Sequence, residues 1–246
     1  VRRIQNDIHT LYGIDASQYD TEKKLVIRKV YDMIPSNMEN KKKRIVVKNI
    51  EKTAGHRRFS DYADEFEYLV NSGVALSVQA VSNPKFPLIE SGTKNLIKLY
   101  LSDVGILSGL LYGLNINAIL SDERSVNLGS LYESVVAQEL HAHGFSLYYY
   151  DNKQRGEVDF LVDDYDALSV LPVEVKSGKD YKVHSALDSF VSIPDYHVKR
   201  AVVLSNEQSV HEKNGITYLP IYYVMFLKED NAPEGSLVIP ELTLPQ

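Results

Sequence analysis

The sequence contains no cysteine, which excludes disulfides, thiol catalysis and cysteine-ligated zinc. A chain without cysteine suits a reducing compartment, so we expect a cytoplasmic protein. No apolar run reaches the ~18 residues that a membrane-spanning helix needs, and no membrane partner is expected. The opening "VRRIQND" has neither an initiator methionine nor a signal-peptide pattern. We therefore expect the sequence to be a piece of a longer protein.

The charge of the chain is divided unevenly along its length. Residues 1–120 hold 17 Lys and Arg against 13 Asp and Glu, a net charge of +4, whereas residues 121–246 hold 10 against 20, a net charge of −10. With 246 residues, of which 44% are hydrophobic, the chain can form two domains with proper cores. We predict a helical region over 1–120 and an α/β domain over 121–246. The charges make the first half the better candidate for contacting phosphates.

The first half shows helical periodicity followed by a strand pair. Ile4, Ile8 and Leu11 recur at helical spacing, a second helix is predicted from Asp20 to Pro35, and a third apolar stripe begins at Phe59. The segments "VALSVQAV" and "LIKLYLSD" read as strands joined by a long loop. Helices followed by a two-stranded ribbon are typical of a winged helix, a fold that binds nucleic acid in some proteins and only joins domains in others.

Basic residues in this half are candidates for nucleic-acid binding. A basic cluster precedes a short apolar stretch, and two further arginines precede the third helix. These candidates are Lys41, Lys42, Lys43, Arg44, Arg57 and Arg58. The alternative is that they are solvated surface charges.

The second half alternates helices with short apolar strands. A helix is predicted over 128–143, strands over 145–150, 157–162, 170–175, 200–204 and 216–219, and helices near 181–191 and 221–227. This order favours an α/β fold with a mixed central sheet. The tyrosine-rich segments "LYYYD" and "IYYV" are interpreted as strand and core residues rather than as a base-stacking surface.

Two of these strands carry ionisable groups in mid-run. Strict alternation places Val158, Phe160 and Val162 on one face and Asp159 on the other. Glu174 and Lys176 share a face of the next strand. Carboxylates in a half-buried strand are costly unless they are neutralised or hold a cation. The alternatives are therefore an ion-pair network and a metal site.

The spacing of these groups resembles the PD-(D/E)XK restriction-endonuclease-like superfamily. The resemblance rests on Asp159 in "GEVDF", on Glu174 and Lys176 in "PVEVKSG", and on Glu133 in "LYESVVAQEL". It implies Mg²⁺ or Mn²⁺ held by Asp159 and Glu174, with the Val175 carbonyl as a third ligand, and phosphodiester hydrolysis. Lys176 would hold the attacking hydroxide or stabilise phosphate charge. Glu133 would be an outer or second-metal ligand.

A narrower resemblance covers almost the entire chain. "YLSDVGILSGL", "GSLYESVVAQEL", "GEVDFLV" and "PVEVKSG" resemble the C-terminal part of bacterial and archaeal AAA-type ATPases that carry domain-of-unknown-function family 4143. The resemblance implies an ATPase domain as the missing N-terminal partner. A phosphate-binding loop needs Gly-x4-Gly-Lys-Ser/Thr, but Gly178-Lys179 is followed by Asp180, so we expect no ATP hydrolysis by residues 1–246.

Two classes of function remain open from the sequence. One is a Mg²⁺-dependent nuclease module that works with an ATPase. The other is a catalytically silent module that docks on nucleic acid or regulates a partner protein. The arrangement of Glu133, Asp159, Glu174 and Lys176 in an open pocket or in a closed ion-pair network would distinguish them.

Overall fold

The computed structural model describes residues 1–16, 18, 23–40, 43–50, 58–113, 115–121, 128–178 and 181–228. Residue contacts divide the chain into two compact units. The helical unit comprises Val1–Ala80 and Thr93–Gln138, and the sheet unit comprises Val81–Gly92 and Glu139–Gln246. The sequence predicts a single boundary between residues 120 and 121, whereas the contacts continue the helical unit to Gln138 and assign the excursion Val81–Gly92 to the sheet unit.

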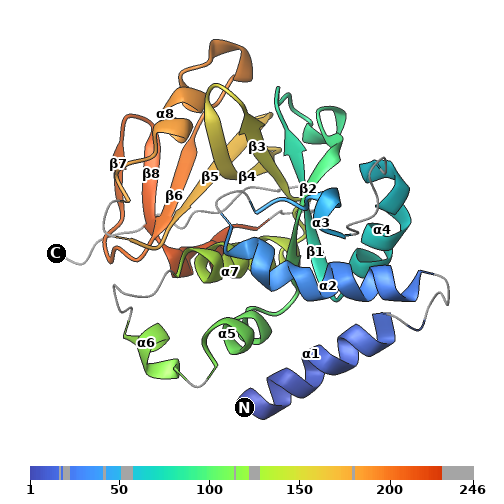
Figure 1. Cartoon of the computed structure of the whole chain (residues 1–246). Coiled ribbons are helices and arrows are strands. Elements are labelled where there is room, and N and C mark those ends of the chain that lie inside the picture. The colour runs from blue at the N-terminus through green and yellow to red at the C-terminus, as the bar shows by residue number, and fades with distance from the viewer. Residues whose placement is uncertain are drawn as a thin grey trace. The chain divides into compact units, whose positions relative to one another are not determined.

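The helical unit contains short helices and one strand pair (Figure 1). Its helices are α1 (Arg2–Ala16), α2 (Lys24–Met38), α3 (Val47–Ile50), η1 (Phe59–Tyr62), α4 (Ala63–Asn71), α5 (Val104–Tyr112) and α6 (Ile116–Leu120). Strands β1 (Ala75–Val81) and β2 (Thr93–Leu101) pair antiparallel. Helix α7 (Gly129–Ala142) runs across the boundary between the units. The predicted strand pair is present, and the winged-helix description stays a prediction.

Helix α2 supplies much of the core of the helical unit. Ile27, Val30, Tyr31 and Ile34 recur at helical spacing and are all almost fully buried. The helix continues to Met38 with Pro35 inside it, so the predicted end at Pro35 is wrong. A proline removes one helical hydrogen bond, but burial of Pro35, Asn37 and Met38 holds the last turn in place.

Two of the three residues of the predicted apolar stripe of α1 are exposed, and the third, Ile8, is half-buried. Ile4 and Leu11 are 61% and 55% exposed, although their spacing is that of a core-facing stripe. The inner face is held by polar contacts instead, because His9 Nδ1 lies 3.0 Å from the Tyr31 hydroxyl and Arg2 Nη1 donates to Ser108 Oγ at 2.8 Å.

The sheet unit contains a mixed sheet in the order β3-β4-β5-β6-β8-β7. Its strands are β3 (Tyr148–Asn152), β4 (Gly156–Asp164), β5 (Ser169–Lys176), β6 (Ala201–Ser205), β7 (His211–Lys213) and β8 (Ile216–Pro220). The β5/β6 and β6/β8 pairs are parallel, and the β3/β4, β4/β5 and β7/β8 pairs are antiparallel. Helix α8 (Ser185–Val191) connects β5 to β6, as a parallel pair requires a crossover (Figure 1). The predicted α/β class with a mixed sheet is confirmed.

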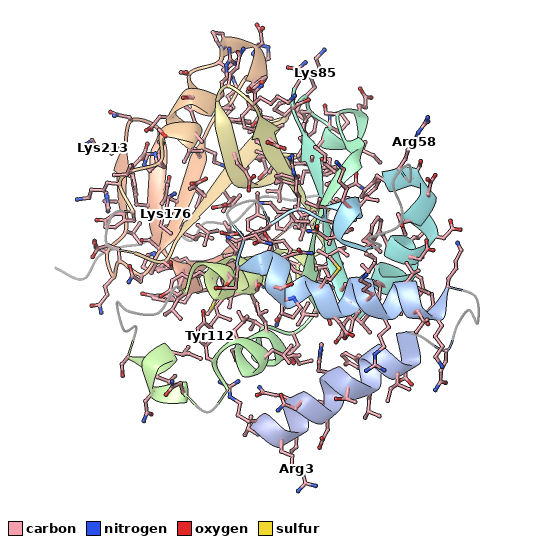
Figure 2. The ribbon with its side chains drawn as sticks, in the orientation of Figure 1. Arg3, Arg58, Lys85, Tyr112, Lys176 and Lys213 are labelled. Atoms are coloured by element: carbon pink, nitrogen blue, oxygen red, sulfur yellow. The ribbon has the colours of Figure 1, made fainter. Side chains whose placement is uncertain are left out.

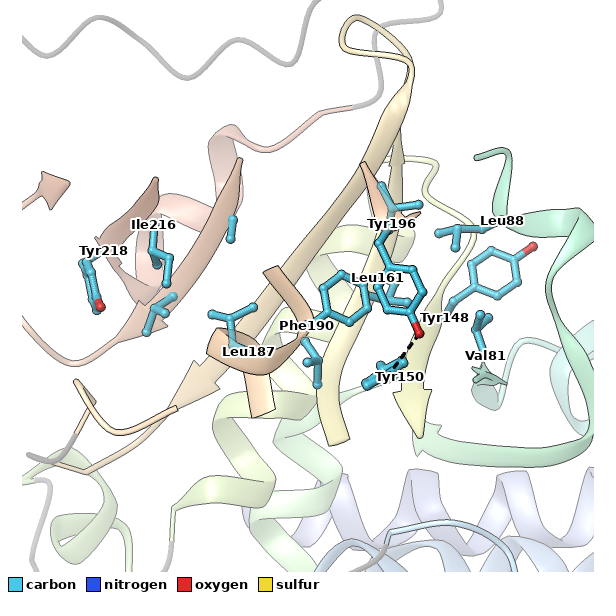
Figure 3. Close-up of a cluster of buried hydrophobic side chains, with 14 of the residues drawn as sticks. Val81, Leu88, Tyr148, Tyr150, Leu161, Leu187, Phe190, Tyr196, Ile216 and Tyr218 are labelled. Atoms are coloured by element: carbon cyan, nitrogen blue, oxygen red, sulfur yellow. Dashed lines mark hydrogen bonds between the residues drawn. The ribbon is translucent and has the colours of Figure 1, made fainter. Parts of the chain in front are cut away.

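One face of this sheet is covered by α8 and the short helix η3 (Pro194–Tyr196). Leu187 and Phe190 of α8 pack into an apolar cluster with side chains from β3, β4, β5, β6 and β8 (Figure 3). Val81 and Leu88 join the same cluster, and the Leu88 backbone N–H donates to Asp163 Oδ1 at 2.9 Å. The loop between β1 and β2, which contains η2 (Leu88–Glu90), is therefore part of the sheet unit.

The last element of the described region is η4 (Ile221–Phe226), a 3-10 helix within the range 221–227 where the sequence predicts a helix. Its short length is typical of a 3-10 helix, which has a tighter turn than an α-helix and occurs mainly in short segments. Within the described ranges, no helix is long and apolar enough to cross a membrane.

Candidate functional site

A register shift in β4 is the local feature that orients the candidate site. Tyr148 pairs with Leu161 while Tyr150 pairs with Val158, so the single residue Tyr149 lies opposite both Asp159 and Phe160. Such a bulge breaks the two-residue alternation of a strand. As a result Val158 and Leu161 both line the apolar cluster under α8. The predicted common face of Val158, Phe160 and Val162 is therefore wrong at Val158.

The Asp159 carboxylate lies where the β4/β5 ladder ends. The paired positions run from Asp164 opposite Ser169 to Phe160 opposite Val173. At the next step Asp159 Oδ2 accepts a hydrogen bond from the Val175 backbone N–H at 2.8 Å. A side-chain oxygen thus takes the place of a ladder carbonyl, which fixes the direction of the carboxylate.

Glu174 and Lys176 form an ion pair beside this hydrogen bond. The Lys176 Nζ lies 2.7 Å from Glu174 Oε1, and Glu174 is 5% exposed while the Lys176 side chain is 29% exposed. Val170 lies in the cluster under α8, and β5 has no register shift in its pairing with β4 or β6. Glu174 and Lys176 therefore share the α8 face of the sheet. The Asp159 carboxylate therefore contacts the Val175 amide, and the two residues that flank Val175, Glu174 and Lys176, pair with each other.

Glu133, the fourth predicted site residue, has partners within the helical unit. It lies on α7 and is 6% exposed. Lys43 Nζ forms a short ion pair with Glu133 Oε1, and the Tyr100 hydroxyl donates to Glu133 Oε2 at 3.3 Å. Lys43 and Tyr100 are 90 and 33 positions away from Glu133 in the sequence. The local spacing of residues therefore could not predict these contacts.

The basic residues predicted to bind nucleic acid divide into three groups. Lys41, Lys42 and Arg57 lie outside the described residues. Lys43 is half-buried in its pair with Glu133. Arg58 is exposed beside η1 (Figure 2), and Arg44 is half-exposed in a bridge with Lys98 of β2.

A polar pair that sequence reasoning missed lies on the same sheet face. His184 Nε2 is 2.7 Å from the Tyr218 hydroxyl, and both residues are buried. Glu174 pairs with Val203 and Val203 with Tyr218 in parallel register, so Tyr218 stands two strands, or about 10 Å, from Glu174. Burial raises the pKa of Tyr218, and the nearby Asp188 carboxylate adds to this rise. The alternating pattern of "ITYLP" indicates that Tyr218 lies on the same buried face as Ile216, and this was the sequence signal that could have identified it.

The His184 ring has a second neighbour on α8. Its Nδ1 lies 3.1 Å from Asp188 Oδ1, yet this nitrogen makes no well-aligned hydrogen bond among the described residues. The His184–Asp188 contact is therefore a close approach of the two side chains without an aligned hydrogen bond. Since Asp188 is 58% exposed at its side chain, its effect on the ring is screened by water.

The two tyrosine-rich segments have different environments. Tyr148, Tyr149 and Tyr150 of β3 are buried as interpreted from the sequence. Tyr222 of η4 is 54% exposed, so the core interpretation of "IYYV" is wrong for this residue. The helix is anchored by buried Val224 and Leu227 instead.

Comparisons with known families match two parts of the chain. Residues 128–224 match the family model described as a domain of unknown function (DUF4143), and residues 1–118 match another domain of unknown function (DUF8612). The first range contains Glu133 and the whole Asp159–Glu174–Lys176 group. Neither a curated protein nor a solved structure matches the chain.

Proposed function

We propose that the sheet unit hydrolyses phosphodiester bonds with a divalent cation, using Asp159, Glu174 and Lys176. The observation that supports the proposal is a pair of neighbouring contacts: Asp159 Oδ2 lies 2.8 Å from Val175 N, and the residues on either side of Val175 pair with each other, with Lys176 Nζ 2.7 Å from Glu174 Oε1. Ionisable groups at an interior strand position are costly. Their position where the β4/β5 ladder ends supports a chemical role.

The donor set fits a hard cation. Asp159 and Glu174 supply carboxylate oxygens, which Mg²⁺ and Mn²⁺ prefer, and one or two carboxylates suffice because Mg²⁺ keeps several of its waters. Burial of Glu174 to 5% exposure makes a cation near it more favourable than in water. When bound, the cation supplies a Lewis acid for the phosphoryl oxygen and a water of lowered pKa.

The chain itself contributes orientation and charge. The Val175 N–H holds the Asp159 carboxylate in one direction, so little reorganisation is needed on binding. The Lys176 ammonium, held by Glu174 and partly exposed, can turn toward a phosphate and stabilise the negative charge that develops there. Glu133 is engaged by Lys43 and Tyr100 and has no part in the proposed mechanism.

The resemblance to AAA-type ATPases supports a setting for this activity. We infer that the chain works next to an ATPase domain and that the helical unit presents Arg44 and Arg58 to nucleic acid. Residues 128–224 match the DUF4143 model, the same family of domains that the resembled ATPases carry. The net charge of −10 over residues 121–246 assigns most phosphate affinity to the first half.

A catalytically silent docking module is the second candidate. Lys176 already neutralises Glu174, and within the described ranges no three or more acidic or histidine side chains meet in a way that could hold a metal ion. Buried ion pairs of this kind can serve only to fix a fold. In this alternative the sheet unit packs against a partner protein and the helical unit binds nucleic acid.

A cleavage assay separates the two candidates. Single- and double-stranded DNA and RNA are incubated with the protein, with and without Mg²⁺. We expect Mg²⁺-dependent cutting that Lys176→Ala lowers by roughly 10² or more. The matched control Lys213→Ala, on β7 of the same unit (Figure 2), should cut like the unmutated protein. If the unmutated protein cuts none of these substrates, the silent module is correct.

A further inference from the structure

A cavity of about 520 Å³ opens between the start of α2 and helix α4, in the helical unit. Its volume lies within the range of small-molecule sites, roughly 300–1,000 Å³. The lining contains the carboxylates of Asp64, Glu65 and Glu67 and one ammonium group, that of Lys23. One positive charge against three negative charges leaves this lining with a net charge of −2.

Glu65 is the buried member of this set. It is 4% exposed, and its Oε1 lies 3.5 Å from Lys23 Nζ, which places the carboxylate at the cavity wall. Its Oε2 is buried and accepts no hydrogen bond from the described part of the chain. A buried carboxylate oxygen without a donor is costly, and a small rotation of the Glu65 side chain toward the cavity would let a cationic donor pair with it.

The contacts of Lys23 indicate which kind of chemical group can bind in the cavity. Its ammonium lies 3.1 Å from Asp64 Oδ2 as well as near Glu65. The hydrogen bond to Asp64 is the main cause of the raised pKa of Lys23. An ammonium group thus already binds at the rim, but it neutralises only part of the charge of the lining.

The remaining lining favours an organic cation. Ile27 and the Tyr68 ring provide walls that an alkyl chain can contact, and Asn71 and Ser72 add polar groups. We propose that this cavity binds a primary ammonium or guanidinium group carried on an alkyl chain, with Glu65 as its main partner.

Isothermal titration calorimetry on the whole chain tests the proposal. The probes are cadaverine and agmatine as free cations, and N-acetyl-arginine amide as a stand-in for an arginine side chain. At low salt we expect at least one probe to bind, and added NaCl to weaken it. A preference for the free cations points to a small molecule, and a preference for the arginine derivative points to a protein side chain.

Three variants assign the binding to the cavity. Glu65→Gln should weaken binding of the probe about tenfold or more, since the amide oxygen can still accept a hydrogen bond but the negative charge that attracts the cation is lost. Glu67→Gln, at an exposed position of the same lining, should weaken binding of the probe less. Asp7→Asn, the same charge change on α1, should leave the affinity unchanged.

Removal of the Lys23 ammonium, which competes with the probe for the same carboxylates, should change the affinity in the opposite direction. Lys23→Ala should strengthen binding of the probe several-fold, because the probe then need not share the Asp64 and Glu65 carboxylates with Lys23. The proposal is overturned if no probe binds the unmutated chain at 10 mM, on the order of the weakest useful affinity. It is equally overturned if Glu65→Gln and Glu67→Gln, both folded, bind as the unmutated chain does.

Discussion

Asp163 of β4 is a partly buried carboxyl whose charged form is disfavoured in the folded sheet unit. Burial raises the pKa of this carboxyl, although the hydrogen bond from the Leu88 N–H lowers it in part. A raised pKa in the folded state means that folding favours the protonated form. Stability from this group is therefore complete below the usual pKa of aspartate and is lost as the pH rises through the raised value.

Asp163→Asn should remove that pH dependence. The amide oxygen can still accept from Leu88 N–H, while the charge is gone. We expect the variant to be more stable than the unmutated chain at pH 7, with the difference shrinking toward zero as the pH falls below the usual range of aspartate. Urea unfolding at a series of pH values measures this. A difference that grows on acidification would contradict the assignment.

At the scale of elements, the helices differ in how much their apolar faces contribute to stability. Helix α2 buries Ile34 completely, whereas α1 leaves Ile4 and Leu11 more than half exposed. Burial of an aliphatic side chain accounts for most of its contribution to folding. The exposed stripe of α1 therefore contributes little within this chain.

Substitution in the two helices should show this contrast. Ile34→Ala should lower the free energy of unfolding by about 2–5 kcal/mol. Ile4→Gln and Leu11→Gln should each change it by less than ~0.5 kcal/mol. Chemical denaturation measures all three. A large loss from either α1 substitution would mean that the stripe is covered in solution.

Across the whole molecule, periodicity predicted most elements of the sheet unit and the α/β class. It could not predict the register shift that places Asp159 and Phe160 opposite Tyr149, because alternation has no signal for an added residue. The pairing of Lys43 with Glu133 depends on contacts 90 residues apart, which spacing cannot reveal. Strand pairing predicted that β4 lies beside β5, and the structure has Asp159 Oδ2 at Val175 N and Lys176 Nζ at Glu174 Oε1, whereas a common site of the three residues stays a prediction.

Metal binding is the most direct test of the proposed site, since it requires no knowledge of the substrate. We expect calorimetric titration with Mn²⁺ to show binding that Asp159→Asn or Glu174→Gln weakens by roughly tenfold or more. Glu212→Gln on β7, the same change away from the site, should bind like the unmutated chain. No binding to the unmutated chain at millimolar Mn²⁺, or unchanged binding in both site variants, would contradict the metal-dependent hydrolase and leave an ion pair in its place.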